Sequence, residues 1–298
     1  SLPDMPQWQG KSKGTPLGYR IFVFIIKGLG VNVAYFVLRF VSFYYFLFSW
    51  NSTGHIYRYF RDRHHYGVLK SILKIYQNYY IFGQTLLDKV IVMAGIENKF
   101  TYDFDGEENL REIVRGGKGG ILLSAHVGNW EAAGHLLKRL DTRINVVMFD
   151  GEHQQIKEYL ERVTGGHKLN IILIKEDISH VYAMGEALQK NELICLHADR
   201  FLEGNKTKFS DLLGEPAPFP VGPFLLAASF RVPVSIVFAF KETKKHYHFF
   251  GSPILTRKDD ELKDDFISRL TSAFVRELEQ KIKMYPEQWF NYYNFWQK

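Results

Sequence analysis

The sequence predicts an α/β protein with a mostly parallel central sheet flanked by helices, preceded by N-terminal amphipathic helices at a membrane interface. From about residue 100 the chain alternates short apolar runs with helical patterns of ten to fifteen residues, the order typical of a parallel sheet covered on both faces. Residues 19–50 are its most apolar and aromatic part. With 298 residues and 46% hydrophobic composition, the chain can bury a core as one large or two modest domains.

The front of the chain carries the basic excess. Residues 1–70 contain nine Lys or Arg but only Asp4 and Asp62, a balance of +7, so the rest of the chain sums to −1 of the total +6. A localised excess of this kind points to an anionic surface, either a membrane or a nucleic acid. The aromatic residues form apolar blocks with few interleaved charges, unlike a nucleic-acid stacking groove. We therefore expect an anionic membrane surface and no nucleic acid as partner.

Residues 19–50 predict helices that lie on the membrane. Lys27 and Arg39 cut the apolar run into pieces of about a dozen, shorter than the roughly 18 residues of a spanning helix. Arg20 and Lys27 share one helical face, and four apolar side chains share another: Phe22, Ile25, Ile26 and Leu29. This is the arrangement of an interfacial helix. The alternative is a set of core helices in a fully soluble fold. No cleavage site of small residues follows a short apolar core, so a secretory signal is not expected.

The rest of the chain supplies the sheet. The predicted strands are apolar and cover residues 119–126, 144–150, 170–175, 193–199, 232–242 and 246–254. The predicted helices cover residues 129–140, 152–163, 179–190, 221–230 and 259–283. The stretch from 200 to 220 reads as a loop rich in Gly and Pro, and the aromatic tail over 284–296 is expected to pack on the body or on lipid. We expect membrane-associating helices over 1–70 and an α/β domain over 71–298.

A histidine and a glutamate follow the first apolar run. Loops after the carboxyl ends of strands line the active crevice of an α/β sheet, and His126 and Asp199 each end a predicted strand, so they can converge. Glu131 stands five positions after His126, in the first turns of a helix. From there its carboxylate can reach one imidazole nitrogen and raise the basicity of the other. No Ser or Cys stands in a G-x-S-x-G pattern. A substrate hydroxyl or amine would then attack a thioester directly, without metal or covalent intermediate.

Simpler interpretations exist for these residues. A histidine that caps a strand and a glutamate near a positive helix N-terminus would explain His126 and Glu131 by themselves. His135, one turn after Glu131, suggests zinc, but the order is not the H-E-x-x-H that places two histidines on one face. The single cysteine, Cys195, lies in an apolar run, which excludes an internal disulfide, fits a reducing compartment and predicts a small core residue.

The stretch SAHVGNWE, residues 124–131, resembles the H-x4-(D/E) block of the lysophospholipid acyltransferase superfamily. Its glycine, asparagine and tryptophan resemble the branch of the late acyltransferases of lipid A biosynthesis. Three further blocks follow in the order of that branch: LHADR at 196–200, the segment 209–234 with its spaced prolines and glycines, and YPEQWF at 285–290. The resemblance covers about residues 15–296.

The resemblance implies acyl transfer from acyl carrier protein or acyl-CoA to a lipid-like acceptor at the cytoplasmic face of the inner membrane, by a peripheral or monotopic protein. It implies no cofactor beyond the thioester co-substrate. His126 would be the general base and Glu131 its orienting partner. Six positions would bind substrate: Asn129, Trp130, Asp199, Arg200, Gly222 and Pro223. Arg200 is a candidate for a phosphate or developing oxyanion, and the Gly-Pro pair would shape the pocket at a helix N-terminus.

One departure bears on the acceptor. The lipid A enzymes usually carry an arginine just after the second strand of this region, whereas residues 148–157 read MFDGEHQQIK without one. A bisphosphorylated lipid A acceptor is therefore not expected, and lysophospholipids, amino-acid lipids, glycolipids and polyene-type pigments stay open. Two rival functions keep the fold: a non-catalytic lipid carrier, and a membrane-surface hydrolase in which water replaces the acceptor.

Overall fold

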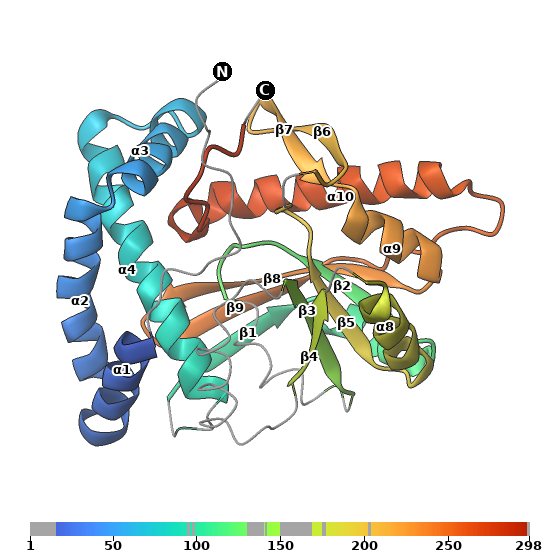
Figure 1. The fold of residues 1–298 in the computed structure, drawn as a ribbon, viewed down its shortest axis with the longest axis horizontal. Helices are drawn as coiled ribbons and strands as arrows, with labels where there is room; N and C mark the ends of the chain where they lie inside the picture. Colours follow the sequence, from blue (N-terminus) through green and yellow to red (C-terminus); the bar gives the residue numbers. More distant parts are fainter. Residues whose placement is uncertain are drawn as a thin grey trace.

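The computed structural model describes residues 16–93, 96, 99–129, 140, 142–149, 169–174, 177–201 and 204–296. Figure 1 shows a central sheet with helices packed against it, and a layer of N-terminal helices beside one end of the sheet. The seven strands are ordered β1-β9-β8-β2-β5-β3-β4. The prediction of an α/β fold with a mostly parallel sheet is confirmed.

All six strands predicted from apolar runs are present in this seven-stranded sheet, and β1 is the strand that was not predicted. The strands are β1 (Thr101–Asp105), β2 (Gly120–Ser124), β3 (Ile144–Phe149), β4 (Leu169–Ile174), β5 (Leu193–His197), β8 (Val234–Thr243) and β9 (His246–Gly251). Strands β8, β2, β5, β3 and β4 run parallel, whereas β9 is antiparallel to β8 and carries β1 parallel to itself. The carboxyl ends of β2 and β5 therefore lie side by side in the middle of the sheet.

Strand β2 is buried along its whole length, because the sheet is covered on both faces. Ile121 and Leu123 point into one core cluster, shared with helices α8 (Ser179–Gln189), α9 (Gly222–Phe230) and α10 (Lys263–Met284). Leu122 points into a second cluster on the other face, with α5 (Glu107–Arg115). Cys195 is buried in this second cluster, as predicted for a small core residue.

The segment predicted as a loop after Asp199 contains a two-stranded hairpin, β6 (Thr207–Leu212) and β7 (Glu215–Pro220). The loop prediction is wrong here because prolines are usually poor strand residues. In β7 they occupy alternate positions, Pro216, Pro218 and Pro220. Alternate residues of a strand turn their N–H groups to the same side, so the missing donors all lie on the side of β7 away from β6.

The N-terminal layer consists of α1 (Pro16–Leu29), α2 (Val31–Phe48), α3 (Trp50–Arg58), the π-helix η1 (Tyr59–Arg63) and α4 (Val68–Met93). Helix α2 packs on α4 through Ala34, Tyr35 and Leu38. The two helices approach closely at Gly83, where an added Cβ would lie 2.6 Å from Leu38 Cδ1. The first three residues of helix α4 precede the domain boundary expected at 70/71, and the rest of the helix belongs to the part expected as the α/β domain.

A buried ion pair joins the N-terminal layer to the sheet. Lys241 Nζ on β8 lies 2.5 Å from Asp88 Oδ2 on α4. The phenols of Tyr35 and Tyr247 also donate to the Asp88 carboxylate, and Gln288 in the 3-10 helix η4 (Pro286–Gln288) pairs with the backbone of Lys241. A buried charge is tolerated when it is paired and fully hydrogen-bonded. The helical layer and the sheet are therefore fixed to each other.

Candidate active site

The sheet brings two predicted site residues together. Strands β2 and β5 are parallel neighbours in which Ser124 lies opposite His197, and Ala198 N donates to Ser124 O over 2.8 Å. Both strands end at the same edge of the sheet. His126 follows Ser124 by two residues, and Asp199 follows His197 by two residues. His126 and Asp199 are therefore neighbours, at the edge where α/β folds place their reactive groups.

Asp199 uses both carboxylate oxygens to hold His126. Its Oδ1 lies 2.8 Å from His126 Nδ1, and its Oδ2 accepts the backbone N–H of His126 over 2.9 Å. The Asp199 side chain is 1% exposed, whereas that of His126 is 24% exposed. A carboxylate accepts from the ring N–H, so Nδ1 carries the proton and the lone pair of the neutral ring is on Nε2.

The surroundings of Asp199 favour its ionised form. Burial by itself would raise the pKa of the Asp199 carboxyl. The charge of His126 and its hydrogen bond, together with Arg200 and His197, outweigh burial and hold the pKa well below its ordinary value. Asp199 is therefore a carboxylate at neutral pH and can stabilise a positive charge on the His126 ring.

His197 is a member of this cluster that the sequence prediction missed. Its Nδ1 lies 3.2 Å from His126 Nε2, and the two rings meet edge to face with centroids 4.3 Å apart. The signal was available in the sequence, because His197 and Asp199 are two positions apart at a strand end and so share one side of the strand. The three side chains form a row, Asp199, His126 and His197.

The loop that carries His126 is fixed by its backbone. Gly128 has φ 57, and a Cβ there would lie 1.8 Å from Ala239 O, so only glycine fits. Its N–H donates to Gln288 O over 2.8 Å. The carbonyl of His126 accepts from Phe290 N over 3.1 Å, and Val127 forms an isolated bridge with Trp289. The C-terminal segment 288–290 thus supports the His126 loop from one side.

Of the other predicted site residues, Asn129 and Arg200 adjoin this centre in the chain, and Gly222 and Pro223 lie on α9. Asn129 is 4% exposed and donates to Thr85 O on α4 over 2.9 Å, so it anchors the loop inward. Arg200 donates to the backbone carbonyl of Phe290. Gly222 and Pro223 form the first turn of α9. Glu131, Trp130 and His135 lie outside the residues that the structure describes.

The family comparison agrees with the predicted resemblance. Residues 73–298 match the family described as bacterial lipid A biosynthesis acyltransferase. A phosphatidylinositol mannoside acyltransferase of Mycobacterium tuberculosis (strain ATCC 25618 / H37Rv) is 26% identical over 188 residues, which cover 62% of this chain and 56% of the relative's length. The crystal structure of the 1-acyl-sn-glycerophosphate (LPA) acyltransferase PlsC from Thermotoga maritima aligns with a TM-score of 0.39 and 11% identity, over 85% of this chain and 97% of that one.

The family match includes β2, the His126 loop, β5 with His197 and Asp199, and the C-terminal segment that supports them. It covers well over half of the chain, from near the start of α4 to the last residue. On this evidence the chain belongs to the bacterial lipid A biosynthesis acyltransferase family.

Proposed function

We propose that this protein is an acyltransferase that moves a fatty acyl chain from a thioester donor to a hydroxyl or amine of a lipid-like acceptor, with His126 as general base. The donor is an acyl carrier protein or acyl-CoA thioester, and no metal takes part. The observation that carries the proposal is the hydrogen bond between Asp199 Oδ1 and His126 Nδ1 at 2.8 Å, beside a partly exposed imidazole whose other nitrogen is free of the proton.

The chemistry is a direct transfer. The acceptor oxygen or nitrogen attacks the thioester carbonyl carbon while its proton passes to His126 Nε2, and Asp199 stabilises the imidazolium that forms. A C–O or C–N bond forms and the C–S bond breaks. The departing thiolate takes the proton back from His126, which restores the neutral ring. No protein nucleophile is needed, because the acceptor supplies it.

His197 has two roles in this proposal. Its Nδ1, 3.2 Å from His126 Nε2, occupies the position from which an acceptor hydroxyl would donate its proton. It therefore keeps Nε2 hydrogen-bonded before the acceptor arrives, and gives way to it. Its ring then lies beside the reacting atoms as a second donor.

The remaining predicted residues keep their places in the proposal with adjusted roles. Because Asp199 occupies His126 Nδ1, a carboxylate at Glu131 would contact the ring at Nε2 or act on substrate. Asn129 supports the loop through Thr85, and Arg200 lowers the pKa of Asp199 and ties it to the C-terminal segment. Trp130, Gly222 and Pro223 stay candidates for substrate contact.

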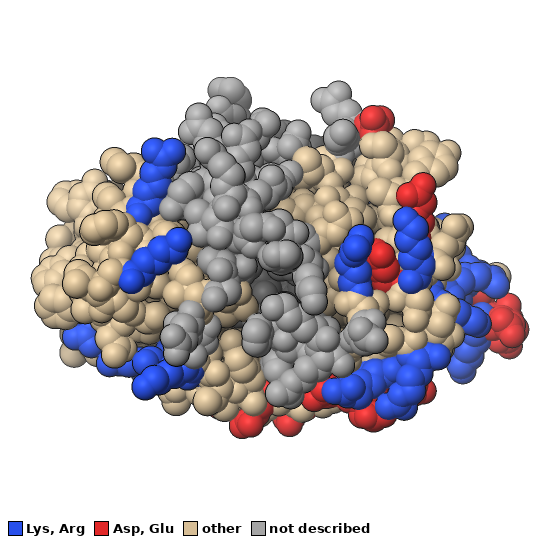
Figure 2. Space-filling view, turned by 90° about the horizontal axis from the view of Figure 1, so that it is seen from below, with Lys and Arg blue, Asp and Glu red and all other residues tan. Residues whose placement is uncertain are grey.

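We place the protein at the cytoplasmic face of the inner membrane, docked through its N-terminal layer. Unlike the short apolar pieces expected from the sequence, helix α2 is by length and composition alone sufficient to cross a membrane even with Arg39 in it, and 22% of its 18 residues are buried. Its outer face exposes a row of aromatic side chains, Phe36, Phe40 and Phe43, which are 58%, 64% and 52% exposed. On the face seen in Figure 2, the part of the molecule formed by this layer is mostly uncharged, with scattered Lys and Arg. An apolar face with basic residues around it suits an anionic membrane.

The test is transfer by the full chain and by His126→Ala. Thiol release from acyl-CoA or acyl carrier protein is followed with and without a lysophospholipid or glycolipid acceptor, and the product is identified by mass spectrometry. His126→Ala is expected to lower turnover by about 10²–10⁴-fold while the protein stays folded. His246→Ala, which removes a histidine of the edge pair Thr101–His246, is the control. Near-normal transfer by His126→Ala contradicts the mechanism, and thiol release that ignores the acceptor favours a hydrolase.

A further inference from the structure

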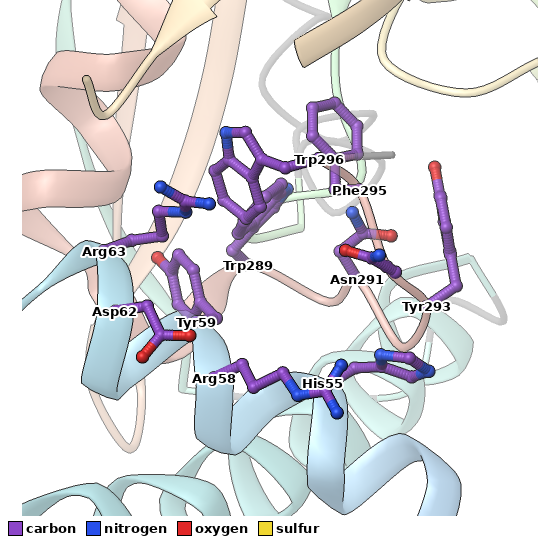
Figure 3. A pocket seen from close by; sticks show the side chains of 11 residues that line it. His55, Arg58, Tyr59, Asp62, Arg63, Trp289, Asn291, Tyr293, Phe295 and Trp296 are labelled. Carbon is purple, nitrogen blue, oxygen red and sulfur yellow. The ribbon is translucent and has the colours of Figure 1, made fainter. Parts of the chain in front are cut away.

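A recess lies between the N-terminal helices and the C-terminal segment, outside the row of Asp199, His126 and His197. Figure 3 shows the side chains that line it, which come from α3, η1 and the tail after η4. Its empty volume, open mouth included, is about 420 Å³. Because this volume includes space open to solvent, the recess suits a small polar group and not a whole lipid.

One side of the recess is aromatic and the other is polar. In Figure 3 the rings of Tyr59, Trp289 and Trp296 lie on one side, and the polar ends of Arg58, His55 and Asn291 gather on the other. A π-helix supplies part of this wall, and π-helical turns often occur at functional sites.

Among the cations of the recess, Arg58 stands apart. Arg63 forms a cation–π contact and an ion pair, since its guanidinium lies 4.6 Å from the Trp296 ring centroid and 3.6 Å from Glu215 Oε1. Arg58 is exposed and forms no ion pair of 4 Å or less with any residue in the described part of the chain. Burial, and then the charge of Arg58, lower the pKa of His55, so the imidazole beside it is neutral. The polar side of the recess thus offers the positive charge of Arg58, while the carboxylate of Asp62 also lines the recess.

Buried polar groups in the wall also lack hydrogen bonds. Within the described ranges, the indole Nε1 of Trp289, the hydroxyl of Tyr59 and both amide atoms of Asn291 have no partner of good hydrogen-bond geometry, although these residues are only 3%, 5% and 7% exposed. The Asn291 amide does lie beside the Tyr293 phenol. Leaving such groups unsatisfied is costly, and an indole N–H can only donate. A bound group with acceptor oxygens would satisfy the donors among them, which are the indole N–H, the Tyr59 hydroxyl and the Asn291 Nδ2, whereas the Asn291 Oδ1 can only accept.

The recess is directly behind the catalytic row. Its lining residue Tyr293 is close enough to Asp199 and Arg200 for both charges to act on its phenol. Trp289 pairs with Val127, next to His126, and the neighbouring Phe290 N–H donates to the His126 carbonyl over 3.1 Å. A polar group held in the recess is thus only one chain segment away from the proposed base.

We propose that this recess binds a phosphate group of one of the two substrates, through Arg58, Asn291 and His55. The inference rests on the proposed function, because only that function makes the bound molecule a substrate. The phosphate belongs either to the headgroup of the lipid acceptor or to the pantetheine arm or nucleotide of the thioester donor. The donors come from two separate elements, α3 and the C-terminal segment, and can therefore reach different oxygens of a tetrahedral phosphate. Arginine together with neutral donors is a common phosphate-binding group.

The first experiment measures binding without catalysis. The melting temperature of the full chain is recorded against inorganic phosphate, with chloride at matched ionic strength. A rise of about 2 °C is expected when phosphate is at ten times its Kd. Arg58→Gln should weaken the apparent Kd about tenfold, the effect of one charge-assisted hydrogen bond, and Arg58→Lys should weaken it less. Asn291→Asp, which places a negative charge in the seat, should abolish the shift.

Lys27→Gln is the matched control, because it removes an exposed cation of the same helical layer away from the recess. Equal phosphate affinity of wild type and Arg58→Gln, or an equal loss in Lys27→Gln, overturns the proposal. Glycerol 3-phosphate and coenzyme A then distinguish the two sources. The compound that competes with phosphate in wild type, and binds less tightly to Arg58→Gln, identifies the substrate that carries the phosphate. In Arg58→Gln the KM for that substrate should rise with little change in kcat. If neither competes, the site holds an adventitious ion only and the inference is wrong.

The inference fails separately from the proposed function. His126→Ala should keep the phosphate-induced shift in melting temperature while it loses transfer. If wild type transfers no acyl group to any acceptor, the catalytic proposal is wrong whatever the recess binds.

Discussion

Asp199 holds His126 at two points, the ring Nδ1 at 2.8 Å and the backbone N–H at 2.9 Å. One buried carboxylate therefore fixes both the tautomer of the imidazole and the path of the loop that carries it. The arrangement makes His126 a preorganised base rather than a side chain that must search for its orientation.

Replacement of this carboxylate should be severe. Asp199→Asn keeps the size of the side chain but can donate to His126 Nδ1, which would move the lone pair to the wrong nitrogen. We expect kcat to fall on the order of 10³–10⁴-fold, as for the orienting aspartate of other histidine bases. Steady-state kinetics with a fixed donor measure the effect.

Glu131→Gln is the comparison for that variant. Since Asp199 already occupies Nδ1, Glu131→Gln should cost less activity than Asp199→Asn. A larger loss in Glu131→Gln than in Asp199→Asn would return the orienting role to Glu131, the role that the H-x4-E spacing alone predicts.

The sequence was sufficient for the strands of the sheet because burial on both faces leaves continuous apolar runs. Strand β2 reads GILLS and is buried at every position. Strand β1 reads TYDFD with alternate exposure. It was not predicted, because its alternating polar residues are also typical of a loop. Strand β7 was predicted as a loop because of its prolines. Local patterns do not reveal which N–H groups a strand has to donate, since that depends on the side on which its partner lies.

The site was predicted in part for the same reason. A motif names His126, but a hydrogen bond across 73 positions depends on the strand order β2-β5, which alternation of strands and helices does not specify. The recess at Arg58 was even less accessible to sequence reasoning. It joins α3 to the C-terminal tail, and its aromatic residues resemble any buried aromatic cluster until their positions are known.

The stability of the fold should depend on acid through Asp199. Its folded-state pKa is depressed, so the stabilisation is complete above the unfolded-state pKa of about 3.9 and is lost as pH falls through the lower folded-state pKa. The free energy of unfolding should therefore fall more steeply below about pH 4 for wild type than for Asp199→Asn. Urea titrations between pH 3 and 7 should show the free energies of unfolding of wild type and Asp199→Asn converging as the pH falls. A difference between them that stays constant with pH would contradict the depressed pKa of Asp199.

His197 should act through His126 and not through substrate affinity. His197→Phe keeps a ring but removes the hydrogen bond to His126 Nε2, and we expect kcat to fall about tenfold with KM unchanged. His197→Asn restores a donor at the position of Nδ1 and should recover part of the loss. Equal activity of the two variants would show that His197 only fills space.

The buried pair of Lys241 and Asp88 should be essential for stability. Lys241→Met leaves the Asp88 carboxylate buried without its cation, at a cost of about 3–5 kcal/mol. The double variant with Asp88→Asn should recover a large share, because no charge is left unpaired. Guanidinium unfolding of the two single variants and the double variant gives the coupling energy, and additive losses would contradict the pairing.

Membrane docking should depend on the outer face of α2. Phe36, Phe40 and Phe43 follow the i, i+4, i+7 spacing of one helical face and are each more than half exposed. Burial of a phenylalanine side chain contributes about 1.5–3 kcal/mol, so Phe40→Ser with Phe43→Ser should weaken binding to anionic vesicles at least tenfold, even with partial insertion.

Leu262→Ser is the matched control for docking, because Leu262 is 69% exposed and precedes α10 at the opposite end of the molecule (Figure 1). Co-sedimentation with vesicles of phosphatidylglycerol and phosphatidylethanolamine measures the difference. Since both phenylalanines are more than half exposed on the outer face of α2, the double variant should retain transfer to acceptors dissolved in detergent while it loses transfer to acceptors in vesicles. If Leu262→Ser weakens vesicle binding as much as the double variant, exposed apolar area in general, and not the α2 face, controls attachment.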